Sequence, residues 1–340
     1  MTRKLNIAIV GVTGAVGEAL LAGLQERDFP VENLYPLASA RSVGKTVRFK
    51  NKNLDVKDLA EFDFTKADIA LFSAGGQVSK EYAPIAAAAG CVVVDNTSCF
   101  RYEDDIPLVV PEVNPERIAD YTHRNIIANP NCSTIQMVVA LKPLQDAVGI
   151  ARINVATYQA VSGTGKKAVT ELIHQVGELL NGRPVKPQVY SQQIAFNVLP
   201  HIDEFLDNGY TREEMKMVWE TRKILEDETI LVNPTTVRVP VLYGHSEAIH
   251  LELKSPLSVD AVRKLLKNAP GVKVVDDPSK LKYPTPIQHA VGHDDVFVGR
   301  IRQDISHPCG INMWVVADNI RKGAATNAIQ IAEILQRFYL

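Results

Sequence analysis

The chain of 340 residues has little of several features that mark specialised classes of protein. It has four cysteines, no CxxC pair and no density typical of a disulfide scaffold, so we expect reduced thiols and a cytoplasmic location. Its net charge of -2 provides no field for nucleic acid or an anionic membrane. No apolar run reaches the length of a membrane span. The remaining composition, 46% hydrophobic and 22% charged, is ordinary for a soluble enzyme of two domains.

The first residues have the pattern that opens a dinucleotide-binding unit. The apolar run Leu5–Val10 predicts a strand, and a glycine-containing turn, Gly11–Gly17, leads into a helix from Glu18. The spacing is GxxGxxG rather than GxGxxG, so the position between strand and helix supports the interpretation more than the spacing does. The same glycines interrupt the apolar stretch, which is therefore read as a first strand and not as a signal peptide.

Two patterns of periodicity divide the chain. Strands and helices alternate up to about residue 128, which predicts a parallel α/β sheet of the Rossmann type. Beyond Arg152 the strands lengthen and alternate apolar with polar residues, for example in 237–241 and 248–253, which predicts a mixed, largely antiparallel sheet with helices on one side. We therefore expect a nucleotide-binding domain over 1–128, completed by the C-terminal helix 320–340, and an α+β catalytic domain over 129–319.

Cys132 is a candidate nucleophile. It follows the turn Asn129-Pro130-Asn131 and precedes Ser133 and Thr134, which are residues typical of a helix start. A helix N-terminus presents unpaired N–H groups and a partial positive charge, and both favour a thiolate. A buried structural cysteine is the alternative.

Two loops are candidates for cofactor contacts. NAD enzymes usually have an acidic residue after the second strand, whereas this chain has Ser39, Arg41 and Ser42, which suit the 2′-phosphate of NADP. Ser162-Gly163-Thr164-Gly165 opens a second helix and allows an anion or flat ring to approach the backbone. An ordinary surface loop and a plain helix start are the respective alternatives.

Charged residues in the second half are open to two interpretations. Thr211 and Glu214 form a capping box, and Glu213 and Lys216 share a helix face, which in isolation favours a solvated ion pair. Arg238 is suited to a carboxylate, and His245 to acid–base chemistry, although each also fits a structural role. His289 and His293 are four residues apart beside a glycine and a strand, so we expect no metal site.

Together these segments resemble aspartate-β-semialdehyde dehydrogenase, in its shorter bacterial form, over nearly the whole chain. The matching segments are Gly11–Gly17, Asp95–Ser98 with Phe100-Arg101, Val109–Asn114, Asn129–Thr134, Gln159 with Ser162–Gly165, Glu213 with Lys216, Arg238 with His245, and Asp318–Gly323. Each segment is short, but their order and spacing together are specific.

The resemblance implies a role for each candidate residue. Cys132 would form an acyl-enzyme thioester, His245 would be the acid–base and Gln159 would orient the substrate. Arg238 would bind the substrate α-carboxylate, Glu213 its ammonium, and Arg101, Lys216 and Asn131 the phosphate. NADP would contact Gly11, Thr13, Gly14, Ala15, Val16, Ser39, Arg41, Ser42, Ser162, Gly163 and Asn319. The family works as a homodimer formed mostly by the second domain, and its product feeds lysine (through diaminopimelate), threonine and methionine synthesis.

Two alternatives stay open at this point. N-acetyl-γ-glutamyl-phosphate reductase shares the fold and the Cys/His chemistry, but its acetylated substrate has no ammonium for Glu213 to meet. A non-catalytic Rossmann paralogue would be expected to lose the thiol, so the presence of Cys132 argues against it.

Overall fold

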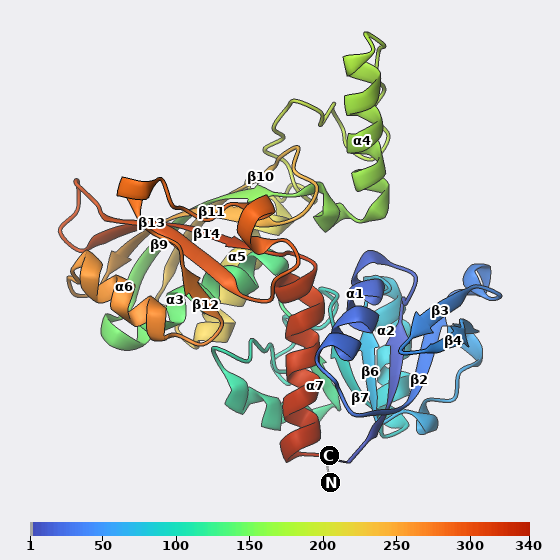
Figure 1. Ribbon diagram of the computed structural model, residues 1–340. Helices are drawn as coiled ribbons and strands as arrows, with labels where there is room; N and C mark the ends of the chain where they lie inside the picture. The colour runs from blue at the N-terminus through green and yellow to red at the C-terminus, as the bar shows by residue number, and fades with distance from the viewer. Residues whose placement is uncertain (1–2) are drawn as a thin grey trace. The chain divides into compact units, whose positions relative to one another are not determined.

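The computed structural model describes residues 3–340, which form two compact units (Figure 1). One unit comprises the chain up to Asn131 together with Ala324–Leu340, and the other comprises Cys132–Gly323. The chain passes from one unit to the other at two points, and each lies a few residues later than the boundaries expected at 128 and 320. The first of these points falls immediately before Cys132.

Unit 1 contains a six-stranded sheet in which all neighbouring strands are parallel. Its strands are β1 (Leu5–Val10), β2 (Val31–Ala38), β5 (Lys57–Asp58), β6 (Ile69–Phe72), β7 (Val92–Asp95) and β8 (Ile126–Ala128), in the order β5-β2-β1-β6-β7-β8. Its helices are α1 (Ala15–Glu26), α2 (Gly76–Ala88) and α7 (Thr326–Phe338), and β3 (Thr46–Phe49) pairs with β4 (Lys52–Asp55) as a separate hairpin. The predicted parallel α/β sheet is confirmed.

The strand order reverses beside β1, because β2 lies on one side of it and β6 on the other. Ligands of open α/β sheets bind at the carboxyl ends of the strands at such a reversal. The turn there is tight: Gly11 has φ +89°, and a Cβ on Gly17 would lie 2.3 Å from the carbonyl oxygen of Gly11. Glycine at both positions lets α1 start close to the end of β1.

The last helix, α7, packs on α1 within unit 1 (Figure 1). Leu20 and Leu24 of α1 share one apolar core with Ile329 and Leu335 of α7. An ion pair reinforces the contact, since Nε and Nη2 of Arg27 each donate to a carboxylate oxygen of Glu333 at 2.7 Å. Residues from the two ends of the chain thus complete unit 1.

Unit 2 contains a six-stranded mixed sheet, as predicted. Its strands are β9 (Ile150–Gln159), β10 (Leu231–Arg238), β11 (His245–Leu253), β12 (Val272–Val274), β13 (Val296–Gln303) and β14 (Gly310–Ala317), in the order β10-β9-β11-β14-β13-β12. The three central pairings are antiparallel, and the two outer ones are parallel. Helices α3 (Cys132–Val148), α5 (Arg212–Leu225) and α6 (Val259–Asn268) contact this sheet.

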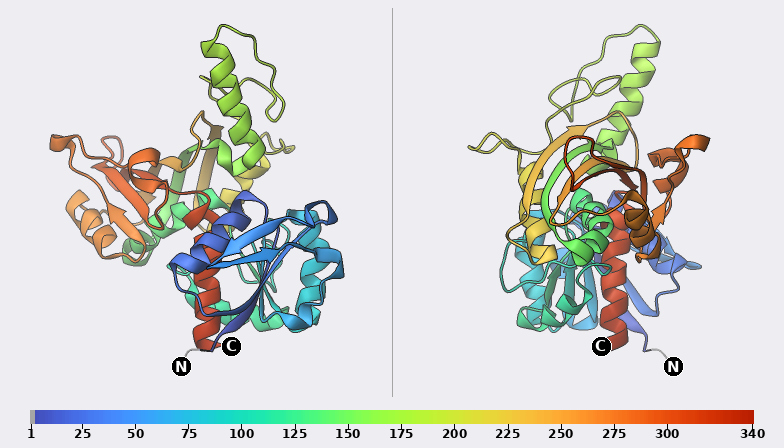
Figure 2. Two further views of the ribbon diagram at one scale, coloured as in Figure 1. Left: turned by 45° about the vertical axis from the view of Figure 1, so that its right-hand side comes forward. Right: turned by 90° about the vertical axis from the view of Figure 1, so that its left-hand side faces the viewer.

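Helix α4 (Lys166–Leu180) and the loop after it stand away from the sheet of unit 2 as an arm, which both views of Figure 2 show. Two buried polar side chains of α4 hold that loop. Glu171 accepts from the backbone N–H of Gln188, and Gln175 accepts from the backbone N–H groups of Ile194 and Ala195 at 3.0 and 3.1 Å. These bonds replace the strand or helix partners that the loop lacks.

The predicted strand over 237–241 is wrong in its bounds. Strand β10 spans Leu231–Arg238 and ends before Pro240. Proline has no N–H to donate to a ladder, so Pro240 cannot continue the pairing. Pro234 lies inside β10 and obscured the strand in the sequence; it is tolerated because β10 is an edge strand.

We expect Gly17→Ala to lower the stability of unit 1 by about 1–3 kcal/mol, because the added methyl group overlaps the backbone of the glycine turn. The matched control is Gly76→Ala at the start of α2, where an added Cβ meets nothing within 4 Å. Urea unfolding of both variants measures the difference. Equal unfolding midpoints for the two variants would contradict the close approach at Gly17.

Candidate active site

Cys132 is the first residue of helix α3, which confirms its predicted place at a helix start. The turn before it is fixed within unit 1, because the side chain of Asn129 donates to Asn96 and accepts from Asn327. The thiol is in no disulfide and is half-buried, whereas the next nine residues of α3, 133–141, are buried. The sequence therefore places one accessible sulfur at the N-terminus of a helix whose first half is buried.

His245, the first residue of β11, is fully buried and held in one tautomer. Its Nδ1 accepts a hydrogen bond from the backbone N–H of Ala160 at 3.0 Å. Burial, reinforced by the charge of Arg238 and opposed by that of Glu213, lowers the pKa of His245 to about 3. The ring is therefore neutral at ordinary pH, and this hydrogen bond assigns its proton to Nε2.

Arg238, the last residue of β10, is 4% exposed and, like His245, is hydrogen bonded to the backbone of Ala160. Its Nη1 donates to the carbonyl oxygen of Ala160 at 2.8 Å. A Cβ on Gly163 would lie 2.9 Å from that Nη1 and 3.3 Å from the ring of His245. The glycine predicted at this loop thus leaves room for both side chains.

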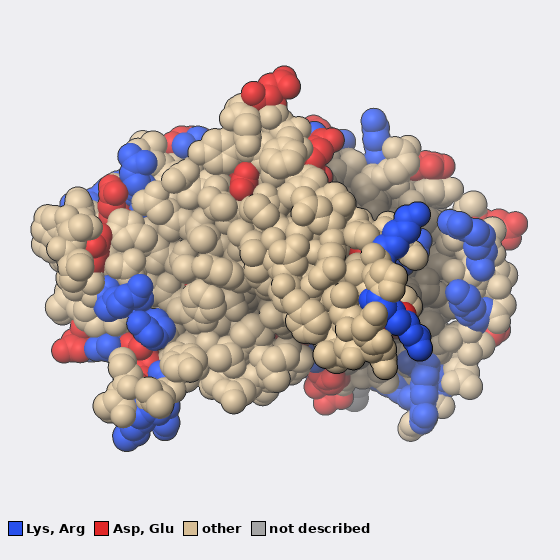
Figure 3. All heavy atoms as spheres, turned by 90° about the horizontal axis from the view of Figure 1, so that it is seen from above, with Lys and Arg blue, Asp and Glu red and all other residues tan. Residues whose placement is uncertain are grey.

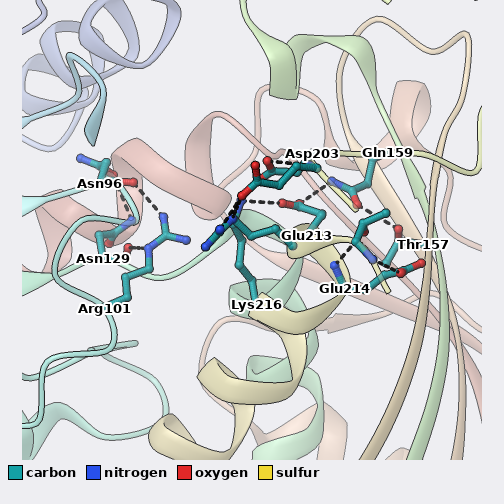
Figure 4. A network of polar contacts seen from close by, with 12 residues as sticks. Asn96, Arg101, Asn129, Thr157, Gln159, Asp203, Glu213, Glu214 and Lys216 are labelled. Atoms are coloured by element: carbon teal, nitrogen blue, oxygen red, sulfur yellow. Dashed lines mark hydrogen bonds and ion pairs between the residues drawn. The ribbon is translucent and has the colours of Figure 1, made fainter. Parts of the chain in front are cut away.

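A buried polar network joins Gln159, Glu213 and Lys216 (Figure 4). Gln159 accepts from Oγ1 of Thr157 at 2.9 Å and donates to Oε1 of Glu213 at 3.0 Å, so its amide orientation is determined. Lys216 contacts Glu213 at 3.0 Å and Asp203 at 2.7 Å. The two side chains of the Glu213–Lys216 pair are 7% and 12% exposed, which makes the interpretation as a solvated ion pair wrong.

The charge of Lys216 is stabilised by its surroundings. Burial works against the ammonium, but Glu213 and Asp203 outweigh it and raise the pKa of Lys216. The capping box between Thr211 and Glu214, predicted from the sequence, fixes the start of α5. One helical turn therefore presents an anion and a cation side by side at a site that is largely closed to water.

Arg101 and Asn131 belong to unit 1. The side chains of Arg101 and Asn131 are both buried. The guanidinium of Arg101 donates to the backbone carbonyls of Asn129 at 2.9 Å and Asn96 at 2.8 Å (Figure 4). These bonds orient a cation beside the turn that precedes Cys132.

The residues predicted to bind the cofactor fall in both units. In unit 1, Gly11–Val16 form the turn at the strand reversal, and Arg41 is exposed after β2 with no ion pair to another described residue. In unit 2, the side chains of Ser162 and Asn319 are hydrogen bonded at 3.0 Å, and Asn319 also accepts from Gly244. The two sets are separate features of their own units.

Within residues 3–340 no group of histidine, cysteine or acidic side chains is arranged to hold a metal ion. His289 instead lies in a short π-helical turn, Pro286–Ala290, and its Nδ1 accepts from the backbone of Thr285. This turn was not expected, since Gly292 argued against a helix. No helix in the described part of the chain is long and apolar enough to cross a membrane.

Two family models match this chain. The model described as semialdehyde dehydrogenase, NAD binding domain, matches residues 6–121, and the one described as semialdehyde dehydrogenase, dimerisation domain, matches residues 141–322. An aspartate-semialdehyde dehydrogenase of Legionella pneumophila is 76% identical over all of this chain and 98% of its own length. The chain belongs to the aspartate-semialdehyde dehydrogenase family. The resemblance drawn from the sequence motifs is therefore confirmed, as is the fold class.

Solved structures of aspartate-semialdehyde dehydrogenases agree with this assignment. The Vibrio cholerae enzyme II, complexed with ASA, is 60% identical and has a TM-score of 0.98, with complete coverage of both chains. The Candida albicans enzyme, solved with NADP, is 27% identical with a TM-score of 0.75, covering 98% of this chain and 99% of that one.

Sequence reasoning missed three participants. Thr157 and Asp203 complete the network around Gln159 and Lys216, and Ala160 provides backbone groups to His245 and Arg238. Thr157 had a signal, since it is two residues from Gln159 on the same strand face. Asp203 and Ala160 had no such signal. Asp203 lies in an irregular loop, and Ala160 acts through its backbone, which is the same for every residue type.

We expect Cys132 to be alkylated first when the reagent is limiting near neutral pH. Burial raises the pKa of Cys91 to about 12 and also raises that of Cys99, so both thiols stay protonated. Peptide mapping by mass spectrometry after partial labelling identifies the modified thiol. First modification of Cys99 or Cys309, with activity retained, would contradict the assignment.

Proposed function

We propose that the chain catalyses the reversible, NADP-dependent reductive dephosphorylation of L-aspartyl 4-phosphate to L-aspartate 4-semialdehyde, through a thioester on Cys132. The observation that carries the proposal is the composition of unit 2. It combines a thiol at a helix start, a neutral histidine with an assigned proton, and buried cationic and anionic side chains. Aspartate semialdehyde synthesis leads to lysine (through diaminopimelate), threonine and methionine, and we place it in the cytoplasm, in keeping with four cysteines that are in no disulfide.

The charged side chains match the charges of this substrate. Arg238 has Nε without a partner, so it retains a donor for the α-carboxylate beyond its bond to Ala160. Glu213 is negative, and a carboxylate has about four acceptor positions, so it binds the ammonium in addition to Gln159 and Lys216. Lys216 and Arg101, with Asn131, supply donors for the phosphate. The negative charge of Glu213 favours this substrate over the N-acetylated one of the sister reductase.

The tautomer of His245 makes its Nε2 a hydrogen-bond donor in the reaction. Cys132 attacks the acyl carbon as a thiolate stabilised by the start of α3, because His245 in its resting tautomer has no free lone pair to take a thiol proton. The net biosynthetic reaction consumes one proton, which ends on the departing phosphate. A neutral His245 with its proton on Nε2 donates a hydrogen bond to the departing oxygen, and the phosphate takes its proton from water. Gln159, whose amide is fixed by Thr157 and Glu213, holds the acyl oxygen.

The residues of unit 1 fit a dinucleotide. The close approach at Gly11 and Gly17 leaves the first N–H groups of α1 directed at the strand reversal, where a pyrophosphate binds in such folds. When bound, NADPH supplies the hydride that reduces the thioester. Arg41, between Ser39 and Ser42, contacts the 2′-phosphate. Ser162, Gly163 and Asn319 form the contacts from unit 2.

We further propose that the functional form is a homodimer built by unit 2, whose matching family model is named for dimerisation. Helices α3, α5 and α6 pack on the sheet face that bears His245 and Gln159. The rings of Tyr158 and Trp314, 5.3 Å apart, point from the opposite face, where a cavity of about 320 Å³ lies. The face seen in Figure 3 has few charged side chains across its middle, and the arm exposes apolar side chains such as Ile173 and Leu180.

We expect Cys132→Ala to abolish phosphate-dependent NADP reduction by aspartate semialdehyde, with a loss of several orders of magnitude in kcat and nearly unchanged NADP binding. Absorbance at the NADPH band measures turnover. Cys309→Ala is the control, since that thiol has no place in the site. Turnover within tenfold of the parent would overturn the thioester route, and preference for N-acetylglutamate semialdehyde would favour the sister reductase.

We expect Arg41→Ala to weaken NADP binding far more than NAD binding, because a charge-assisted contact contributes about 1.5–3 kcal/mol. Lys45→Ala, in the same exposed loop, is the control. Titration calorimetry with both dinucleotides gives the comparison. Equal losses for NADP and NAD would show that Arg41 does not contact the 2′-phosphate.

A further inference from the structure

A second row of polar side chains lies beneath the row that forms the site. In the register of the sheet, Arg238 pairs with Gln159 beside His245, and two residues earlier on the strands Thr236 pairs with Thr157. Glu247 pairs with the same Thr157 from the other side. All members of the second row are fully buried. The third row, Pro234, Val155 and Ile249, is apolar, so the polar character stops one pleat below the site.

Glu247 has a buried carboxyl group that takes no part in the proposed reaction. It lies two residues after His245 on β11, on the same face of the sheet. Both carboxyl oxygens are inaccessible to solvent and have no hydrogen-bond partner of good geometry. Burial raises the pKa of Glu247 well above its usual value of 4.5, and among the described residues the amide of Gln136 is the group that opposes this shift. Burial therefore favours the protonated carboxyl, and Gln136 is its polar neighbour.

Gln136 lies one turn after Cys132 on α3, so the two residues share a helix face. It is fully buried, and neither of its amide atoms has another partner in the structure. A protonated carboxyl and a primary amide are complementary, because each offers one donor and one acceptor to the other. An ionised carboxylate could only accept, which would leave the amide oxygen without a donor.

We propose that Glu247 and Gln136 are positioning residues that form a neutral acid–amide pair and hold the strand of His245 in register with the helix of Cys132. The proposal rests on the function proposed above. Glu247 lies two residues from His245 and Gln136 lies four from Cys132, so the pair connects the two elements where their relative position matters for chemistry. Displacing a reacting group by about an ångström lowers a rate on the order of a hundredfold.

The kinetic test uses the full chain with three variants. We expect Glu247→Leu and Gln136→Leu each to lower kcat at least tenfold while KM for aspartate semialdehyde stays within about twofold. Glu247→Gln keeps a donor and an acceptor, so it should retain kcat within about threefold. The double variant Gln136→Leu/Glu247→Leu should be no slower than either single one.

Thr236→Val is the control for burial in the same row. It removes a buried hydroxyl that has no partner, and it lies on β10, two strands away from the strand that bears Glu247, so we expect kcat within twofold of the parent. The rate of Cys132 alkylation provides a readout that does not depend on turnover. It should change in Glu247→Leu and stay unchanged in Thr236→Val.

A second measurement tests the protonation state without any activity assay. The unfolded chain releases the proton of Glu247 above about pH 4.5, whereas the folded protein keeps it. Folding is thus penalised as pH rises, and the unfolding constant of the parent should grow relative to Glu247→Gln up to tenfold per pH unit. The gap in unfolding midpoint between Glu247→Gln and the parent should therefore widen from pH 5 to pH 8.

Three results would overturn the proposal that Glu247 and Gln136 form a neutral pair. They are a kcat in Glu247→Leu within twofold of the parent, a Glu247→Gln variant as slow as Glu247→Leu, and a stability gap that is independent of pH. If the parent itself fails to turn over aspartate semialdehyde, the proposed function fails. The stability measurement would still decide whether Glu247 is neutral and paired.

Discussion

The chemistry of unit 2 depends on the main chain at Ala160. Its N–H fixes the tautomer of His245, and its C=O fixes the guanidinium of Arg238. Ala160 directly follows β9, which pairs with parallel β10 on one side and antiparallel β11 on the other, so β9 and β10 end, and β11 begins, at the same edge of the sheet. A shift of one residue in either pairing would turn a whole strand over and remove its residue from the site. The register of the sheet is therefore what holds the proton and the cation in place.

The site beside this edge contains buried ionisable groups, which a stable core does not need. Burying a charge is unfavourable unless it is paired, and here Lys216 has two carboxylates within hydrogen-bond distance. His245 meets the same constraint differently, because it stays neutral and uses one ring nitrogen as an acceptor. Some groups, such as Nε of Arg238, have no hydrogen-bond partner within the protein. This is the pattern expected of a site whose remaining hydrogen bonds are made to a ligand.

The sequence predicted the architecture well wherever side chains recur with a period. The parallel sheet, the mixed sheet, the start of α3 at Cys132 and the return of α7 all follow from apolar spacing, glycine turns and capping residues. It failed at β10, where Pro234 interrupts the pattern of an edge strand and only the partner strand justifies the assignment. The motif taken in isolation also favoured a solvated pair of Glu213 and Lys216, because spacing on a helix does not reveal what covers it. The backbone contacts of Ala160 could not be predicted, since every residue type provides the same N–H and C=O.

The return of α7 to unit 1 has a consequence for biosynthesis of the chain. Unit 2 is a continuous insertion, whereas unit 1 needs residues from both ends of the polypeptide. During translation the N-terminal strands emerge first, yet the apolar side of α1 has no cover until Ile329 and Leu335 have been made. Unit 2 can thus complete its fold while unit 1 is still waiting for its last helix, so a nascent chain passes through a state with exposed apolar surface that chaperones recognise. Premature termination shortly before residue 326 would leave the beginning of the protein, and not only its end, unfinished.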